Sequence, residues 1–512
     1  MPSIFDLARR QPDKTVLRFL PGGQAMTCGE LAQAAADAAA WMLSIGLRPG
    51  DTLALLCENR AELLVFALGA RRVGLYYTPI STHLKPRELS HILSSSGARA
   101  LVTSSALAPL ARQVAGEDGL ALGGFVLPGD GDAAGWPQVS LPSRRGALDD
   151  ALPPAPVGRD FLYSSGTTGL PSGIRKPMVP WEARHEEDRE VAAWRRSFDF
   201  GEDTVYFSAA PLYHAAPLRY AMRVLECGGS CVLMDRFDAQ AALAALNDWD
   251  VTHSQWVPTM FVRLLALPPQ VREQGVPHRM RAAIHAAAPC PPDVKRAMIE
   301  WWGPIIHEYY AGSEGVGMTA IDSHEWLAHP GSVGRAKVGV VRITDEDGKV
   351  LPVGADGLIW FEGGPRFEYY GDPAKTARAY NAHGWATYGD IGRLDADGYL
   401  YLGDRRADLI LSGGVNVYPR EIEDVLTRHP QVADAAVIGM PDADMGEVVK
   451  AFVKPIGGPA DEALRAELLR FCREQLSGIK VPRIIEFRDD IPRLDSGKLL
   501  RRRLRDESAG GG

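Results

Sequence analysis

The chain has 512 residues, of which 46% are hydrophobic and 23% are charged, and its formal net charge is -8. This composition is that of a globular protein, and the length exceeds what one hydrophobic core supports, so two or more domains are expected. The negative charge gives no reason to expect nucleic acid or an anionic membrane as the main partner.

The cysteines and the first residues of the chain bear on where the protein is located. The six cysteines form no CxxC pair, and so long a chain needs no disulfide framework. Met1–Asp6 lacks the charged-then-apolar pattern of a secretory signal. The most apolar stretches are much shorter than the roughly 20 residues that span a bilayer. We therefore expect a cytoplasmic protein with no membrane span.

Short apolar runs alternate with helical segments in the first half of the chain. Strands are predicted at 52–57, 98–103, 230–235 and 281–285, and a helix at 60–73. Apolar strands separated by helices predict parallel sheets that are covered on both faces, and therefore an α/β fold.

A loop rich in Ser, Thr and Gly follows a short apolar strand at 160–163. Backbone N–H and hydroxyl groups in such a loop can surround phosphate oxygens. It is not the GxxxxGK[ST] loop, because no lysine follows its second glycine. Taken alone, such a segment is more often a simple turn. The loop residues in question are Ser164, Ser165, Gly166, Thr167, Thr168 and Gly169.

The pattern of residue types changes after about Lys337. Gly, Asp and aromatic residues punctuate short alternating runs, which predicts antiparallel hairpins. A smaller α+β unit is expected from Arg405 onward, with helices at 420–429 and 461–475.

Four segments resemble, in the same order, the motifs of the acyl-adenylate-forming superfamily, which contains acyl-CoA synthetases, firefly-type luciferases and peptide-synthetase adenylation domains. Tyr163–Gly173 is similar to YTSGTTGxPKG, and Tyr310–Glu314 is similar to YGxTE. Gly389-Asp390 resembles the TGD motif, and 492–498 matches PxxxxGK. Four ordered motifs make chance agreement very improbable, and the N-terminal 150 residues look most like acyl-CoA synthetases.

The resemblance implies a two-domain architecture. Residues 1–404 would form an AMP-binding domain of layered α/β sheets with a β-barrel-like subdomain. Residues 405–512 would form a small, mobile α+β domain that rotates between two half-reactions. The family usually has Asp or Lys at the pivot, where this chain has Ala407.

The resemblance also implies roles for individual residues. Glu314 would hold Mg²⁺ and Ser313 would donate to a phosphate oxygen of ATP. Lys498 would contact the α-phosphate while the acid attacks. Asp390 would accept hydrogen bonds from both ribose hydroxyls, and Arg405 would contact the ribose region.

Further residues are matched to the adenine and the thiol. Tyr309 or Tyr310 would stack on the base, beside a slot of small residues, although such residues also fill protein cores. Glycines would let the pantetheine arm of CoA pass close to the backbone. The slot residues are Ala287, Ala288 and Pro289, the glycines are Gly413 and Gly414, and Arg72 and Lys480 match positions near the CoA nucleotide.

One departure concerns the phosphate loop. Ser172 stands where many relatives carry a lysine, and nearby Arg175 or Lys176 could compensate.

The sequence does not identify the acid substrate or the thiol acceptor. His214 resembles a histidine that lines the acyl pocket, but it could equally be a packed side chain. The wall candidates are mostly small and apolar, which favours a fatty, aromatic or sterol-like monocarboxylate. Arg219 and Arg223 lie one helical turn apart and offer a dicarboxylate (malonate-type) as the minority alternative.

The predicted function is thus an ATP-dependent acid–CoA ligase that uses ATP, Mg²⁺ and CoA. The nearest alternative is an enzyme that loads a carrier-protein thiol in trans. A nucleotide-binding scaffold without catalysis is the alternative from another class. A homodimer is expected only because the resemblance to the family implies one.

Overall fold

The computed structural model describes residues 3–118, 121, 123–127, 129, 135–141, 148–164, 171–187, 189–274, 278–287, 290, 292–345, 347–402, 410–417, 419–457, 460–492 and 501–509. Among these residues, no helix has the length and apolar character needed to cross a bilayer.

The first sheet is parallel throughout, in the order β6-β5-β3-β4-β7. Its central strand β3 is buried along its whole length, as expected for a parallel strand covered on both faces. The strands are β3 (Thr52–Leu56), β4 (Tyr76–Pro79), β5 (Ala98–Thr103), β6 (Gly124–Val126) and β7 (Arg159–Asp160), and the helices of this region are α2 (Cys28–Ser44), α3 (Ala61–Arg72), α4 (Pro86–Ser95) and α5 (Ala108–Asp118).

The second sheet has the order β16-β15-β14-β13-β12-β10-β11-β1-β2. Its inner strands are parallel, and β2, β15 and β16 are antiparallel to their neighbours. The strands are β1 (Thr15–Leu20), β2 (Gln24–Thr27), β10 (Val205–Ser208), β11 (Ser230–Met234), β12 (His253–Trp256), β13 (Ala282–His285), β14 (Ile306–Tyr310), β15 (Met318–Ile321) and β16 (Arg335–Val338). The helices are α1 (Ile4–Arg10), α6 (Arg189–Phe198), α7 (Ala215–Glu226), α8 (Ala239–Asp248), α9 (Pro258–Leu265), α10 (Pro269–Gln274), α11 (Pro292–Trp302) and α12 (Ser323–Ala328).

One hydrophobic core joins the two sheets. Its buried residues come from β3, β5, β10, β11 and β13 and from the helices α2, α3 and α7. Helices α2 and α3 pack so closely at Gly69 that an added Cβ would lie 2.7 Å from the carbonyl oxygen of Ala35. The glycine therefore permits this close packing. Residues of α7 belong to the same core.

Two small antiparallel sheets follow. One has the order β19-β9-β8 and the other the order β17-β18-β20-β21, an open path among the described residues. Their elements are β8 (Leu162–Ser164), β9 (Ser172–Arg175), β19 (Glu368–Tyr369), α13 (Pro373–Arg378), β17 (Val340–Thr344), β18 (Gly357–Glu362), β20 (Ile391–Leu394) and β21 (Leu400–Leu402).

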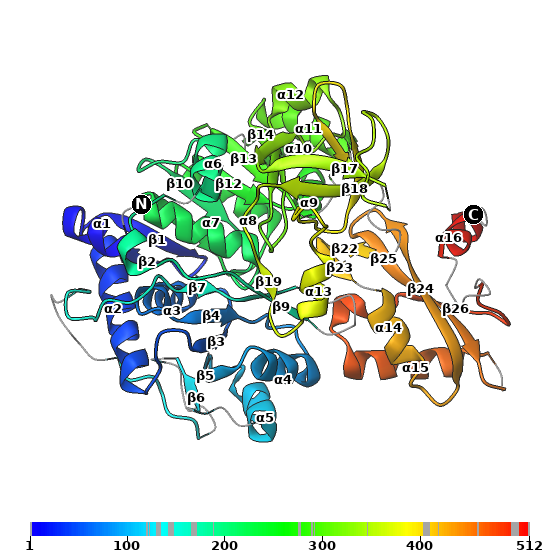
Figure 1. Ribbon diagram of the computed structural model, residues 1–512, viewed down its shortest axis with the longest axis horizontal. Coiled ribbons are helices and arrows are strands. Elements are labelled where there is room, and N and C mark those ends of the chain that lie inside the picture. Colours follow the sequence, from blue (N-terminus) through cyan, green and yellow to red (C-terminus); the bar gives the residue numbers. More distant parts are fainter. Residues whose placement is uncertain are drawn as a thin grey trace.

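The C-terminal unit, drawn in orange to red in Figure 1, has its own sheet and core. The sheet has the order β23-β22-β25-β24, and β26 also pairs with β25. The elements are β22 (Ile410–Ser412), β23 (Val415–Val417), α14 (Pro419–Leu426), β24 (Val432–Asp442), β25 (Gly446–Pro455), α15 (Glu462–Gln475), the 3-10 helix η2 (Gly478–Lys480), β26 (Ile484–Phe487) and α16 (Arg501–Ala509).

The predicted fold class is confirmed: layered α/β sheets precede antiparallel hairpins and a small α+β unit. The predicted β-barrel-like subdomain is, among the described residues, the open sheet β17-β18-β20-β21 and not a closed barrel. The predicted helix at 60–73 is α3, and the one at 420–429 begins one residue earlier and ends sooner, at Leu426. The boundary between 404 and 405 lies outside the described residues and stays a prediction.

Candidate nucleotide and acyl site

Part of the predicted site lies outside the described residues, and the roles predicted there stay predictions. These residues are Ser165, Gly166, Thr167, Thr168, Gly169, Ala288, Pro289, Arg405, Ala407 and Lys498. The structure does describe the elements that flank them.

Strands β8 and β9 meet at the base of the Ser/Thr/Gly loop. They are antiparallel, and Ser164 lies opposite Ser172. The Nζ atom of Lys375, on α13, donates to Oγ of Ser172 at 2.8 Å and lies 4.1 Å from the ring centre of Tyr369. An ammonium group therefore stands at the base of the loop, although Ser172 itself carries no charge.

The two cations that were expected to compensate for Ser172 have other contacts. Arg175 forms an ion pair with Glu368 at 2.7 Å, and its guanidinium lies 3.9 Å from the ring centre of Tyr370. Lys176 is buried and lines a charged cavity behind α7. The compensating role of Arg175 or Lys176 stays a prediction, and Lys375 is the cation that contacts Ser172 among the described residues.

The loop after β14 carries Ser313 and Glu314. The Tyr369 hydroxyl donates to Oε1 of Glu314 at 2.7 Å. Gly312 is needed here, because a Cβ would lie 2.4 Å from the Tyr388 ring and 2.7 Å from Oε2 of Glu314. A carboxylate oriented in this way fits Mg²⁺ whose other ligands are phosphate oxygens and water.

Arg219 connects this loop to the first sheet. Its Nη1 donates to the carbonyl of Ser313 at 3.0 Å, and its Nε donates to Oδ2 of Asp160 on β7 at 2.9 Å. Burial opposes ionisation of Asp160, but the charges of Arg219, Lys176 and Arg159, together with the Arg219 hydrogen bond, outweigh burial and lower the Asp160 pKa. Because Arg219 is engaged in this way, the dicarboxylate alternative loses support.

Tyr310 and Asp390 form the centre of the predicted ribose site. The Tyr310 hydroxyl donates to Oδ2 of Asp390 at 2.6 Å, and both residues are buried. Tyr309 points to the other face of β14, where its ring stacks on that of Tyr220 with 5.8 Å between centres. Of the two tyrosines predicted to meet the base, only Tyr310 therefore lies beside Asp390.

Ala287 has an unusual backbone conformation. It follows β13, is exposed, and has φ at 76°. The left-handed region costs a non-glycine residue about 1–2 kcal/mol, and such residues gather at functional sites. This conformation supports the predicted role of Ala287 in the adenine slot.

His214 precedes the first residue of α7. Its side chain is accessible to solvent, yet the surrounding protein desolvates it and lowers its pKa to about 4, and His83 adds to this shift. The imidazole is therefore neutral at physiological pH, which suits a residue lining the pocket better than one forming an ion pair with the acid.

With the site described, the chain can be compared with known proteins. The model of the AMP-binding enzyme family matches residues 4–370, and that of the AMP-binding enzyme C-terminal domain matches residues 421–498. The chain belongs to the AMP-binding enzyme family. The predicted membership of the adenylate-forming superfamily is confirmed.

Relatives of this AMP-binding enzyme span nearly its whole length. It is 32% identical over 507 residues to a feruloyl-CoA synthase from Amycolatopsis, covering 97% of this chain and 96% of the relative. It is 32% identical over 510 residues to a fatty acid–[acyl-carrier-protein] ligase from Streptomyces coeruleorubidus, covering 97% and 94%. The solved structure of an amide bond synthetase from Marinactinospora thermotolerans superposes with a TM-score of 0.84 at 25% identity, covering 99% of each chain.

The glycine loop of the AMP-binding enzyme meets the larger part of the molecule. Gly413 and Gly414 lie between β22 and β23 with positive φ angles of 56° and 78°. A Cβ on Gly414 would lie 3.7 Å from the Val257 side chain, just before α9. The predicted thiol-tunnel loop is thus docked on the second sheet.

A buried charge cluster lies at the same interface. Nζ of Lys480 donates to Glu88 on α4 at 2.7 Å and to Glu421 on α14 at 2.8 Å. Burial raises the pKa of Glu421 to about 7, and the charge of Glu88 adds to the shift against the opposing effect of Lys480. Lys480 therefore joins the two units in this structure, and its predicted place near the CoA nucleotide stays a prediction.

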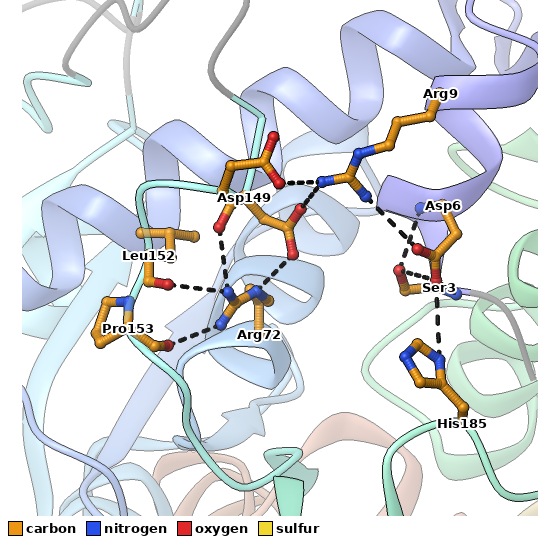
Figure 2. Close-up of polar contacts among 9 residues, drawn as sticks. Ser3, Asp6, Arg9, Arg72, Asp149, Leu152, Pro153 and His185 are labelled. Atoms are coloured by element: carbon orange, nitrogen blue, oxygen red, sulfur yellow. Dashed lines mark hydrogen bonds and ion pairs between the residues drawn. The ribbon is translucent and has the colours of Figure 1, made fainter. Parts of the chain in front are cut away.

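Arg72 is also engaged within the protein. Figure 2 shows its guanidinium donating to Asp149 and to the carbonyls of Leu152 and Pro153, while Arg9 holds Asp149 from the other side. The Arg72 side chain is 8% exposed. Its predicted place near CoA is not supported by these contacts.

A cavity of about 610 Å³ lies between α1, α3 and α7. Arg219 and Met222 of α7 line it together with Tyr77 and Trp181. The cavity is lined by both acidic and basic side chains, and some of these form ion pairs. Arg219 and Asp160, for example, lie 2.8 Å apart. The cavity therefore offers mixed, not purely apolar, walls.

Sequence reasoning missed Lys375, Tyr369 and Tyr388. The aromatic residues follow no motif spacing that would single them out. Lys375 had one usable signal: it sits in Asp372-Pro373-Ala374-Lys375, a helix start, in a chain that lacks the usual loop lysine.

Proposed function

We propose that this protein is an ATP-dependent carboxylic acid–CoA ligase that forms an acyl-adenylate and then a thioester. The observation that carries the proposal is the convergence of Glu314, Tyr369, Lys375 and Ser172 at the base of the phosphate loop. The names of the relatives support the same reaction class.

In the first step, a carboxylate oxygen of the acid attacks the α-phosphorus of ATP, and the bond to pyrophosphate breaks. Asp390, oriented by Tyr310, would accept hydrogen bonds from the ribose hydroxyls. Ser313 and the β8–β9 loop would bind the phosphates. Glu314 would hold Mg²⁺, which neutralises phosphate charge when bound. Lys498 is predicted to stabilise the charge that develops on the α-phosphate.

In the second step, the thiolate sulfur of CoA attacks the acyl carbonyl, and the bond from that carbon to AMP breaks. The docked Gly413-Gly414 loop would line the approach of the thiol, since glycines allow close passage along the backbone. Neutral His214 would face the acyl group without forming an ion pair. We propose an apolar monocarboxylate as the acid.

The test is pyrophosphate release by the purified protein with ATP and Mg²⁺, across short, long, aromatic, dicarboxylic and steroid acids, with and without CoA. The expected result is acid-dependent release that is faster with CoA, with acyl-CoA detected by mass spectrometry. No release with any acid, together with no binding of ATP, would contradict the proposal.

A second candidate is transfer of the acyl group to a carrier protein. The similarity to the fatty acid–[acyl-carrier-protein] ligase favours it. Pyrophosphate release without acyl-CoA, together with acylation of an added phosphopantetheinylated carrier protein, would select this candidate.

A further inference from the structure

Lys375 reaches strand β9, at the base of the phosphate loop, from a distant part of the chain. It lies 203 residues after Ser172, to which its Nζ donates. Its backbone N–H is capped by Asp372 at 2.8 Å, and Thr376 of the same helix accepts a hydrogen bond from the Tyr369 N–H at 2.9 Å. Strand β19 in turn pairs with β9. Helix α13 is therefore fixed against the strand that begins at Ser172.

The surroundings of the ammonium group are those of an anion site. Among the described residues, the Ser172 hydroxyl is its one hydrogen-bond acceptor, although an ammonium group has three donors. Burial lowers the pKa of Lys375, while the negative charge of Glu314 acts against that shift. A half-buried cation held by a neutral hydroxyl leaves both charge and donors for a further ligand.

A purely structural tether would have different chemistry. A neutral side chain would link α13 to β9 without the desolvation that an ammonium group suffers. The charge instead stands at Ser172, where the matching family motif carries a lysine. A lysine point charge suits a phosphate group.

We infer that Lys375 is a phosphate-binding residue of the nucleotide site and supplies, from α13, the charge that Ser172 does not. The inference rests on the proposed function, since it takes ATP as the ligand of the loop. It assigns Lys375 to the β- and γ-phosphates, because the α-phosphate is already matched to Lys498.

The test measures equilibrium binding of ATP and of AMP, without acid or CoA. Lys375→Gln keeps a donor for Ser172 but removes the charge. We expect its ATP affinity to fall about 10- to 100-fold and its AMP affinity to stay close to that of the unaltered protein. Ser172→Ala removes the tether and keeps the charge, so its loss of ATP affinity should be clearly smaller than that of Lys375→Gln. Arg378→Met removes an exposed charge from the same helix and is the matched control.

A relocated charge provides the second measurement. In the double variant Lys375→Gln with Ser172→Lys, the lysine returns to the loop, and ATP affinity should recover. Melting temperatures show whether each variant is folded. If Lys375→Gln is unstable, the ATP affinity of the double variant tests the assignment of Lys375 instead.

Two results would overturn the assignment. One is a Lys375→Gln protein that binds ATP as tightly as the unaltered protein. The other is an equal loss of ATP and AMP affinity that Ser172→Ala reproduces, which indicates a structural tether. In either case the unaltered protein still binds ATP, so the proposed function stands. Only a protein that binds no nucleotide and releases no pyrophosphate contradicts the function itself.

Discussion

The hydroxyl of Tyr310 and the carboxylate of Asp390 come from segments 80 residues apart and meet at 2.6 Å in a buried place. A hydrogen bond to a charged group is stronger than one between neutral groups. The contact orients Asp390 before any ligand arrives, so the ribose hydroxyls would meet a carboxylate that is already positioned.

Tyr310→Phe tests this orientation. The substitution removes one donor from Asp390 and keeps the ring, so we expect ATP and AMP affinity to fall together, by about 1–2 kcal/mol or 5- to 30-fold. The measurement is the same nucleotide titration. Tyr309→Phe is the matched control, because Tyr309 packs on the other face of the strand. Unchanged affinity in Tyr310→Phe would exclude this role.

At the scale of elements, α11 is joined to β14 by a buried ion pair. Nζ of Lys295 lies 2.6 Å from Oε2 of Glu308, and the Lys295 side chain is fully buried. Burial lowers the pKa of Lys295 and raises that of Glu308, while their mutual attraction opposes both shifts. Glu308 directly precedes Tyr309 and Tyr310, so this pair supports the strand that carries the predicted ribose site.

Lys295→Met should be strongly destabilising, because it leaves Glu308 buried without its cation. We expect a loss of about 3–5 kcal/mol in the free energy of unfolding, measured by urea denaturation. The double variant Lys295→Met with Glu308→Leu removes both charges and should recover much of that loss. If the single and double variants were equally unstable, packing rather than charge would account for the effect.

At the scale of the whole molecule, the two units are held together by Glu88, Lys480 and Glu421. Lys480 and Glu421 belong to the C-terminal unit and Glu88 to the first sheet region. Undocking would separate Glu88 from the other two and expose Glu421 to water. The pKa of Glu421, about 7 in the docked state, would then fall toward its usual value of 4.5.

This difference gives docking a pH dependence. A raised pKa in the docked state stabilises docking fully below about pH 4.5, and this contribution is lost as pH rises through about 7. The charged groups that act on the Glu421 carboxyl group are Lys480 and Glu88. We expect the docked fraction, measured by fluorescence transfer between labels on the two units, to fall between pH 5 and 8. Glu88→Gln should flatten the profile, and a profile that rises with pH would contradict this account.

The sequence predicted the order of elements well, because parallel strands buried on both faces are continuous apolar runs such as 52–56. It also located Glu314, Asp390 and the glycine loop through their motifs. It could not choose between Tyr309 and Tyr310, since neighbours on a strand point to opposite faces and the deciding partner is Asp390. Lys375 was missed because its partner lies 203 residues earlier. The sequence also could not show that Arg72 and Lys480 have carboxylate partners within the protein, because those partners are distant in the chain.

The small sheet β19-β9-β8 has a consequence for synthesis on the ribosome. Strand β9 gains its second partner only when Glu368 reaches Arg175, which is 193 residues away. At roughly 5–20 residues per second, the ribosome needs about 10–40 s to cover that distance. During this interval the nascent chain carries the phosphate loop without Tyr369 or Lys375. Any contribution of Tyr369 and Lys375 to the proposed nucleotide site is therefore made only late in synthesis.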